Sequence, residues 1–157
     1  MKAILGIDPG RTGGCAWIKG QEVDVFSFTG ATDKEILNAF RLFWERDRGM
    51  RGMIEAVGAF PGQGVHSMFV FGMGYGRLQG YLEALGVPYN RVSPVTWKKS
   101  LGLARKTGKT DRKERKRLSR QAAQRLYPHV EVDDSTAEAL LIAHYGVNLG
   151  WKPPIKW

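Results

Sequence analysis

Four carboxylates occupy positions where acidic residues are uncommon, and their spacing indicates a shared role. Asp8 ends the apolar stretch "ILGID", and Glu55 lies within the apolar stretch "GMIEAV". Asp134 and Glu138 belong to "DDSTAEALLIA" and are four residues apart, so a helix there would place both on one face. Carboxylates among apolar neighbours are seldom structural, and Glu55 in particular needs a functional explanation.

The chemistry that such a set of acids could perform depends on a cation. Four carboxylates brought to one point would repel each other and lose hydration. Mg²⁺ or Mn²⁺ removes that problem because carboxylate oxygens are the hard ligands these ions prefer. Two such ions about 4 Å apart can activate water and stabilise a leaving oxygen in phosphodiester cleavage. The acids therefore predict a two-metal site.

Each acid also has a simpler explanation when it is taken alone. Asp8 precedes a proline and could be a turn residue, and Glu138 could be an exposed helix residue. Asp134 could cap the last helix. Asp133 is a fifth candidate because it adjoins Asp134 and could exchange roles with it. The set in this order is more specific than any one member.

The positive charge of the chain is concentrated in one segment. The net charge is +9, and residues 105–120, "RKTGKTDRKERKRLSR", hold nine Lys or Arg residues against two acids. A local excess of this kind favours a surface that binds a polyanion, although a solvated helix face would look similar. Nucleic acid is the polyanion that fits a phosphodiester-cleaving site.

Length and composition narrow the possible classes of protein. A chain of 157 residues with 43% hydrophobic residues is predicted to form one domain, residues 1–157. No apolar run approaches the ~20 residues of a membrane span, and Asp8 and Pro9 interrupt any signal-peptide core. Cys15 is the single cysteine, so no internal disulfide can form and a buried structural thiol is expected. We therefore expect a cytoplasmic protein without a membrane partner.

The elements that must position the acids follow from periodicity and turn signals. Strands are predicted over 3–8, 15–18 and 23–28, joined by short turns into an antiparallel meander. Thr32 and Glu35 form a capping box that starts a helix, which ends at Gly49. A strand over 50–57 follows.

The second half of the chain is predicted to be mostly helical. A helix over about 65–86 carries Gly72, Gly76 and Gly80 on one face, which indicates that another backbone packs closely there, from the sheet or from a partner subunit. A strand follows over 87–92. Ser93 and Pro94 start a short helix. Two further helices are predicted over about 111–127 and 134–148.

This order of elements is that of a ribonuclease H-like fold. We expect an α/β protein whose five-stranded mixed sheet begins with three antiparallel strands and is flanked by helices. In such a sheet the first and fourth strands are neighbours, and the start of the last helix can pack across their ends. Asp8, Glu55, Asp134 and Glu138 would then meet at one point.

The sequence resembles a known family, the RuvC-like Holliday junction resolvases. "ILGIDPGRTGG" is similar to their first-strand motif, "MIEAV" to their second acidic motif, and "DDSTAEALLIAHYG" to their C-terminal acidic helix. "FGMGYGRLQGYL" and "PVTWKKSLGL" also fit. The resemblance covers nearly the whole chain. The four-residue spacing of Asp134 and Glu138 resembles phage-encoded members.

The resemblance implies a homodimeric endonuclease that uses two Mg²⁺ or Mn²⁺ ions to nick two strands of a four-way DNA junction. By position, the metal ligands would be Asp8, Glu55, Asp134 and Glu138. The family also places basic residues and an aromatic wedge against the DNA. The residues expected in these roles are Lys98, Arg105, Lys106, Lys109, Lys113, Arg117, Phe60 and Phe69, with Phe71 as a further wedge candidate.

Three alternatives remain open from the sequence. A related nuclease of the same fold could act on flaps, forks or other branched DNA. A DNA-binding protein with an inactive site would bind without metal-dependent nicking. "GIDPGRTGG" is also similar to the first-strand motif of sugar-kinase and actin-like ATPases, but their two large lobes do not fit a chain of 157 residues.

Overall fold

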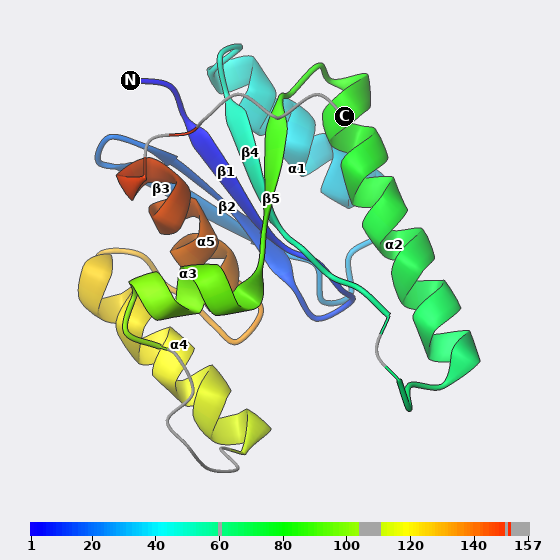
Figure 1. Ribbon diagram of the computed structural model, residues 1–157. Helices are drawn as coiled ribbons and strands as arrows, with labels where there is room; N and C mark the ends of the chain where they lie inside the picture. Colours follow the sequence, from blue (N-terminus) through cyan, green and yellow to red (C-terminus); the bar gives the residue numbers. More distant parts are fainter. Residues whose placement is uncertain (60, 104–110, 150, 152–157) are drawn as a thin grey trace.

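The computed structural model describes residues 1–59, 61–103, 111–149 and 151 (Figure 1). Within them, five strands form one sheet and five helices surround it. The strands are β1 (Ile4–Asp8), β2 (Gly14–Lys19), β3 (Glu22–Ser27), β4 (Arg51–Glu55) and β5 (Tyr89–Val92). The helices are α1 (Asp33–Arg46), α2 (Val65–Ala84), α3 (Pro94–Ser100), α4 (Arg112–Leu126) and α5 (Ala137–Asn148).

The sheet has the order β3-β2-β1-β4-β5. β1, β2 and β3 pair in antiparallel fashion, whereas β4 pairs parallel to both β1 and β5. The prediction of a mixed sheet that begins with three antiparallel strands is therefore confirmed. The expected contact between the first and fourth strands is also present, because β1 and β4 are hydrogen-bonded neighbours.

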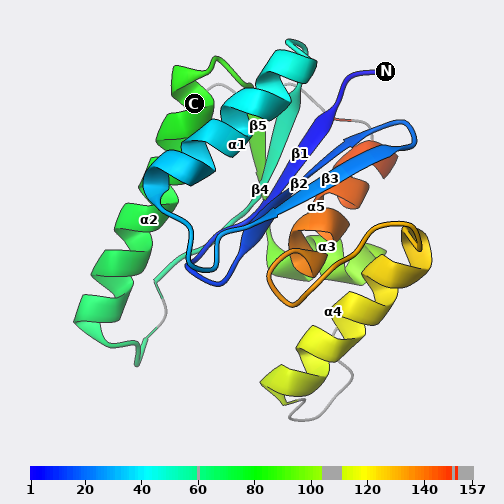
Figure 2. The ribbon, with the colours of Figure 1, turned by 180° about the vertical axis from the view of Figure 1, so that it is seen from behind.

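Helices α1 and α2 cover one face of the sheet (Figure 2). The Thr32 side chain accepts a hydrogen bond from the backbone N–H of Glu35, and the Glu35 carboxylate accepts one from Thr32, so the predicted capping box is present. Large side chains fill this side of the core, among them Trp17 and Phe40. Their burial makes this face one of the two hydrophobic supports of the sheet.

Helices α3, α4 and α5 lie on the opposite face (Figure 1). Ser93 caps α3 as predicted, accepting a hydrogen bond from the backbone N–H of Thr96. α5 packs directly on β1 at Gly6, where a built Cβ would lie 2.3 Å from the backbone N of Ala143 and 2.4 Å from the carbonyl O of Ala139. Only glycine permits an approach this close. The backbones of β1 and α5 are therefore in direct contact.

Two element boundaries differ from the predictions in ways that concern the acids. β4 ends at Glu55 rather than continuing to residue 57, and α5 begins at Ala137 rather than near residue 134. Asp134 therefore precedes the helix and does not share a helical face with Glu138.

Within the described residues, no helix combines the length and apolar character needed to cross a bilayer.

Candidate active site

Asp8 and Glu55 meet because the two strands that carry them run in parallel. Ile7 pairs with Ile54 in the register of β1 and β4, so the next residues, Asp8 and Glu55, end the two strands side by side. Side chains alternate between the faces of a sheet. Ile7 and Ile54 both belong to the core under α1 and α2. Asp8 and Glu55 therefore project to the opposite face, toward α3 and α5.

Glu138 reaches the same place from the first turn of α5. The backbone contact at Gly6 seats α5 on β1, two residues from Asp8. Glu138 is adjacent to Ala139, one of the residues in that contact, and both Glu138 and Asp8 are only 8% exposed. We call Asp8, Glu55 and Glu138 the acidic centre.

Burial and neighbouring charges act on the carboxylates of Asp8 and Glu55. Burial, followed by the charges of Glu138 and Glu55, raises the pKa of Asp8 to about 8, while Lys116 and Lys98 act in the opposite direction. Burial also raises the pKa of Glu55, an effect that its hydrogen bond from Trp97 and the charge of Lys98 partly offset. A desolvated cluster of acids of this kind favours the approach of positive charge.

Two neutral donors and one lysine contact the glutamates of the acidic centre. The indole Nε1–H of Trp97 donates to Glu55 Oε2 at 2.7 Å, and the Ser119 hydroxyl donates to Glu138 Oε1 at 3.0 Å. Lys98 Nζ lies 3.3 Å from Glu138 Oε1. Helices α3 and α4 thus both reach the acids.

The structure does not place Asp134 in the acidic centre. Its side chain is 58% exposed and pairs with Arg120 at 3.2 Å. Its carbonyl oxygen accepts a hydrogen bond from Lys116. Asp134 therefore lies outside α5, in the turn of residues 134–136 that precedes the helix.

Asp133 has a structural role. Its Oδ1 accepts hydrogen bonds from the backbone N–H groups and the hydroxyls of Ser135 and Thr136. Burial alone would raise the pKa of Asp133, but these hydrogen bonds lower it below its usual range. Asp133 thus organises the turn into α5, and of the two neighbouring aspartates neither joins the three central acids.

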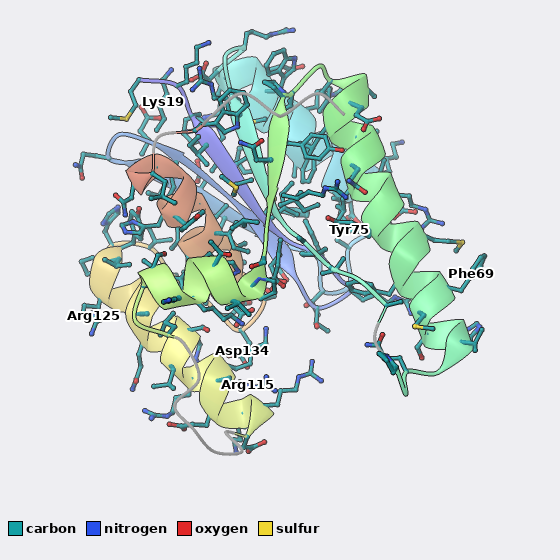
Figure 3. The ribbon with its side chains drawn as sticks, viewed as in Figure 1. Lys19, Phe69, Tyr75, Arg115, Arg125 and Asp134 are labelled. Atoms are coloured by element: carbon teal, nitrogen blue, oxygen red, sulfur yellow. The ribbon has the colours of Figure 1, made fainter. Side chains whose placement is uncertain are left out.

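A polar groove of about 720 Å³ adjoins the acidic centre along α4. Its walls come from α4, from the turn before α5 and from the loops that hold Thr12 and Thr29. The residues lining it are Thr12, Thr29, Asp111, Arg112, Lys113, Lys116, Arg120, Asp133, Asp134 and Ser135. We call it the α4 groove. Figure 3 shows Arg115 of α4 and Asp134 on this same side of the molecule.

The predicted DNA-binding residues fall into three groups. Lys113 lines the α4 groove, and Lys98 points to the acidic centre. Arg117 instead pairs with Glu114 on the exposed side of α4. Phe69 is 66% exposed and points outward from α2 (Figure 3), whereas the Phe71 ring lies over Gly10 in the turn after β1. The predicted residues Phe60, Arg105, Lys106 and Lys109 lie outside the described residues.

Divalent cations fit the acidic centre by donor chemistry. Three carboxylates supply hard oxygen ligands, and their mutual repulsion is visible in the raised pKa of Asp8. In the described part of the chain, however, no three His, Cys, Asp or Glu side chains are grouped closely enough, as they stand, to hold a metal ion.

Sequence reasoning missed Trp97, Lys116 and Ser119. A signal for Ser119 exists in the sequence, since Ser119, Ala122 and Ala123 are the buried residues of α4 and follow a helical spacing inside a run of charges. Trp97 immediately precedes Lys98 in the sequence, and a buried indole N–H usually has a hydrogen-bond partner.

The fully buried Cys15 is a structural thiol, as predicted, and burial raises its pKa.

The arrangement of the sheet and helices defines a ribonuclease H-like fold. No profile of a known protein family matches the sequence, and no curated protein matches it. Among solved structures, RuvC of Thermus thermophilus in complex with a Holliday junction substrate matches with a TM-score of 0.63 and 16% identity, covering 99% of this chain and 100% of that chain. A further structure of T. thermophilus RuvC matches with a TM-score of 0.58 and 18% identity, covering 98% and 99%. The chain has a RuvC-like fold over nearly its whole length.

Proposed function

We propose that this protein is a metal-dependent endonuclease that resolves four-way DNA junctions by paired nicks. The observation that carries the proposal is the meeting of Asp8, Glu55 and Glu138 beside the basic α4 groove. The RuvC-like fold supports it, because the matching RuvC structure holds a Holliday junction substrate. The phage-type assignment rests on the sequence spacing of Asp134 and Glu138 and stays a prediction.

The residues of the acidic centre would hold the cations. Asp8, Glu55 and Glu138 offer carboxylate oxygens from three elements that the fold fixes against one another. Mg²⁺ or Mn²⁺ would supply water activation and charge compensation for phosphodiester hydrolysis. Lys98 keeps positive charge at Glu138 and stands where a phosphate neighbouring the acids can be bound. Asp134 has no direct part in this scheme.

The α4 groove is suited to the DNA backbone. Arg112, Lys113, Lys116 and Arg120 line it, and the hydroxyls of Thr12 and Thr29 add neutral donors. Lys and Arg bind phosphates chiefly through release of counterions, which is independent of sequence. A strand lying along this groove would pass next to the acidic centre.

A homodimer is supported by the surface of α2. One side of this helix, which includes Leu78 and Leu82, packs on the core. The opposite side is apolar and exposed, and within the described residues added Cβ atoms at its glycines would meet nothing within 4 Å. This α2 outer face consists of Val65, Phe69, Gly72, Met73, Gly76 and Gly80.

The sequence offers two explanations for the α2 glycines, packing on the sheet or packing on a partner subunit. The sheet of the same chain does not pack against Gly72, Gly76 or Gly80. An exposed apolar face of this kind marks a surface that packs against another protein. A second copy of the chain, packed helix against helix, would cover this face and give the two active sites that a symmetric junction requires.

A cleavage panel tests the proposed function. Four-way, three-way, flap and linear DNA are incubated with the protein and Mg²⁺, Mn²⁺ or EDTA, and the nicks are mapped. We expect two symmetric nicks in the four-way junction that require a divalent cation and are absent with D8N. Preferred cleavage of flaps or three-way DNA would replace the proposal with a related branched-DNA nuclease. Tight binding without any nicking would contradict nuclease function.

A further inference from the structure

The two glutamates of the acidic centre are each held by a buried, uncharged donor. Trp97 is 0% exposed, and its indole N–H donates to Glu55 Oε2 at 2.7 Å. Ser119 is buried as well, and its hydroxyl donates to Glu138 Oε1 at 3.0 Å. In both pairs the donor comes from a helix and the carboxylate from a different element. The two contacts therefore fix the glutamates relative to α3 and α4.

Only one oxygen of each glutamate takes part in these contacts. Among the described residues, no hydrogen bond reaches Glu55 Oε1, Glu138 Oε2 or the carboxylate of Asp8. A neutral donor orients a carboxylate without changing its charge, and at Glu138 the Lys98 ammonium contacts the same oxygen, Oε1, that Ser119 holds. The second oxygen of each glutamate thus keeps its ability to bind a cation.

The donors also link the acids to the helices that carry positive charge. Trp97 is followed by Lys98, whose ammonium lies 4.9 Å from the indole centroid and contacts Glu138. Ser119 sits on the inner side of α4, while Lys116 and Arg120 of the same helix line the α4 groove. A purely structural role would require only that the buried indole and hydroxyl be satisfied, and a backbone carbonyl would serve that purpose.

We propose that Trp97 and Ser119 are positioning residues for metal binding, each holding one oxygen of Glu55 or Glu138 so that the other oxygen is presented to a divalent cation. The inference rests on the proposed metal-dependent function. Partners that orient metal ligands have a measurable effect, since their loss lowers metal affinity by roughly 10- to 100-fold. Loss of either donor is therefore expected to lower the affinity for the cation more than it lowers the free energy of unfolding.

The test measures Mn²⁺ binding by isothermal titration calorimetry on the full-length protein. S119A removes a single oxygen atom, and we expect its Mn²⁺ dissociation constant to rise about 10-fold or more. S27A is the matched control, because the Ser27 hydroxyl also takes part in a side-chain hydrogen bond, which it accepts from Ser135 at 2.7 Å, but does not contact the acidic centre. The control should bind Mn²⁺ as the original protein does.

The Trp97 contact is tested by W97F, with W44F as control. Trp44 packs against the core under α1 and α2, away from the acids. W97F keeps most of the aromatic packing, and an increase of about 10-fold in the Mn²⁺ dissociation constant is expected. A measurement without mutation accompanies it. In ¹H–¹⁵N spectra the indole signal of Trp97 should shift on Mg²⁺ addition, whereas that of Trp44 should not.

A double-mutant cycle separates positioning from general stabilisation. If Ser119 acts through Glu138, S119A should have no further effect on Mn²⁺ binding in an E138A background. Unchanged Mn²⁺ affinity in S119A and W97F, or equal losses with and without Glu138, would overturn the inference while leaving the nuclease function standing. A protein that binds Mn²⁺ but nicks none of the DNA substrates would instead overturn the proposed function. Absence of any Mn²⁺ binding would contradict both.

Discussion

Helices α2 and α4 lie on opposite faces of the sheet, and their outer surfaces differ in kind. The α2 outer face is apolar and rich in glycine, whereas α4 exposes a row of Lys and Arg residues. Their inner sides differ as well, because α2 buries Leu78 and Leu82 and α4 buries Ser119 beside Glu138. The outer face of α2 is therefore suited to contact with another protein surface. The outer face of α4 is suited to binding a polyanion next to the acidic centre.

The largest expected effect concerns the acids on the α4 side. E138Q should lower the rate of junction cleavage by about 10³-fold or more, a loss of ~4 kcal/mol of transition-state stabilisation. D134N is the matched control, since Asp134 is exposed and its carboxylate pairs with Arg120 at the surface. Its rate should stay close to that of the original protein. Equal losses of cleavage rate in E138Q and D134N would indicate that Asp134 is also a metal ligand. Single-turnover cleavage at saturating metal measures both.

A second prediction uses the pKa of Asp8 in metal-free protein. The folded state holds this proton up to about pH 8, whereas the unfolded chain releases it near the ordinary value of 3.8. The unfolded state therefore binds fewer protons in between, and stability should fall as the pH rises from about 4 to about 8. D8N removes this effect. At pH 7 in EDTA it should be more stable by ~1–3 kcal/mol, given ~1.4 kcal/mol per pKa unit and partial relaxation of the site.

Urea unfolding across this pH range measures the difference. Mg²⁺ should stabilise the original protein but not D8N, because the variant lacks one of the proposed ligands. A D8N protein that is less stable than the original in EDTA would contradict the electrostatic picture of the acidic centre.

A third prediction sharpens the assignment of α4 to DNA. K113A should weaken junction binding and reduce the slope of log K against log salt by ~0.9 if Lys113 neutralises one phosphate. R125A is the control, because Arg125 is at the far end of α4 from Arg115 (Figure 3) and outside the α4 groove. The salt slope of R125A should be unchanged. Fluorescence anisotropy at several salt concentrations gives both slopes, and equal slopes for both variants would remove the α4 groove as the phosphate surface.

The smallest expected effect is on α2. Alanine in place of glycine stabilises a helix interior by ~1 kcal/mol. G74A should show this gain without affecting association, since Gly74 is not part of the α2 outer face. G76A should show the same gain within the monomer but weaken the dimer, because the new methyl group would separate the two helices. Sedimentation equilibrium measures association, and identical behaviour of the two variants would argue against the helix pair.

Much of the fold could be predicted because its signals are local. The Thr32–Glu35 capping box and Ser93–Pro94 each depend on neighbouring residues, and both are present in the structure. Asp8 and Glu55 could be paired from the expected strand order, which the register of β1 and β4 confirms. The role of each acid in metal binding stays a prediction.

The turn before α5 could not be predicted from spacing alone. The four-residue interval between Asp134 and Glu138 indicates a shared helical face, but Asp133 accepts hydrogen bonds from Ser135 and Thr136 and delays the start of the helix to Ala137. Such a competition between local hydrogen-bonding patterns is decided by small free-energy differences. The Trp97 and Ser119 contacts join residues far apart in the chain, which periodicity cannot reveal.

The contact at Gly6 has a consequence for redesign of this protein. Helices that pack through side chains can shift when those side chains are exchanged, but β1 and α5 touch backbone to backbone at Gly6, Ala139 and Ala143. The spacing of the two backbones that carry Asp8 and Glu138 is thereby set by van der Waals contact between main-chain atoms. The aromatic core under α1 and α2 can be repacked for thermal tolerance without altering that spacing, whereas one methyl group at Gly6 would alter it.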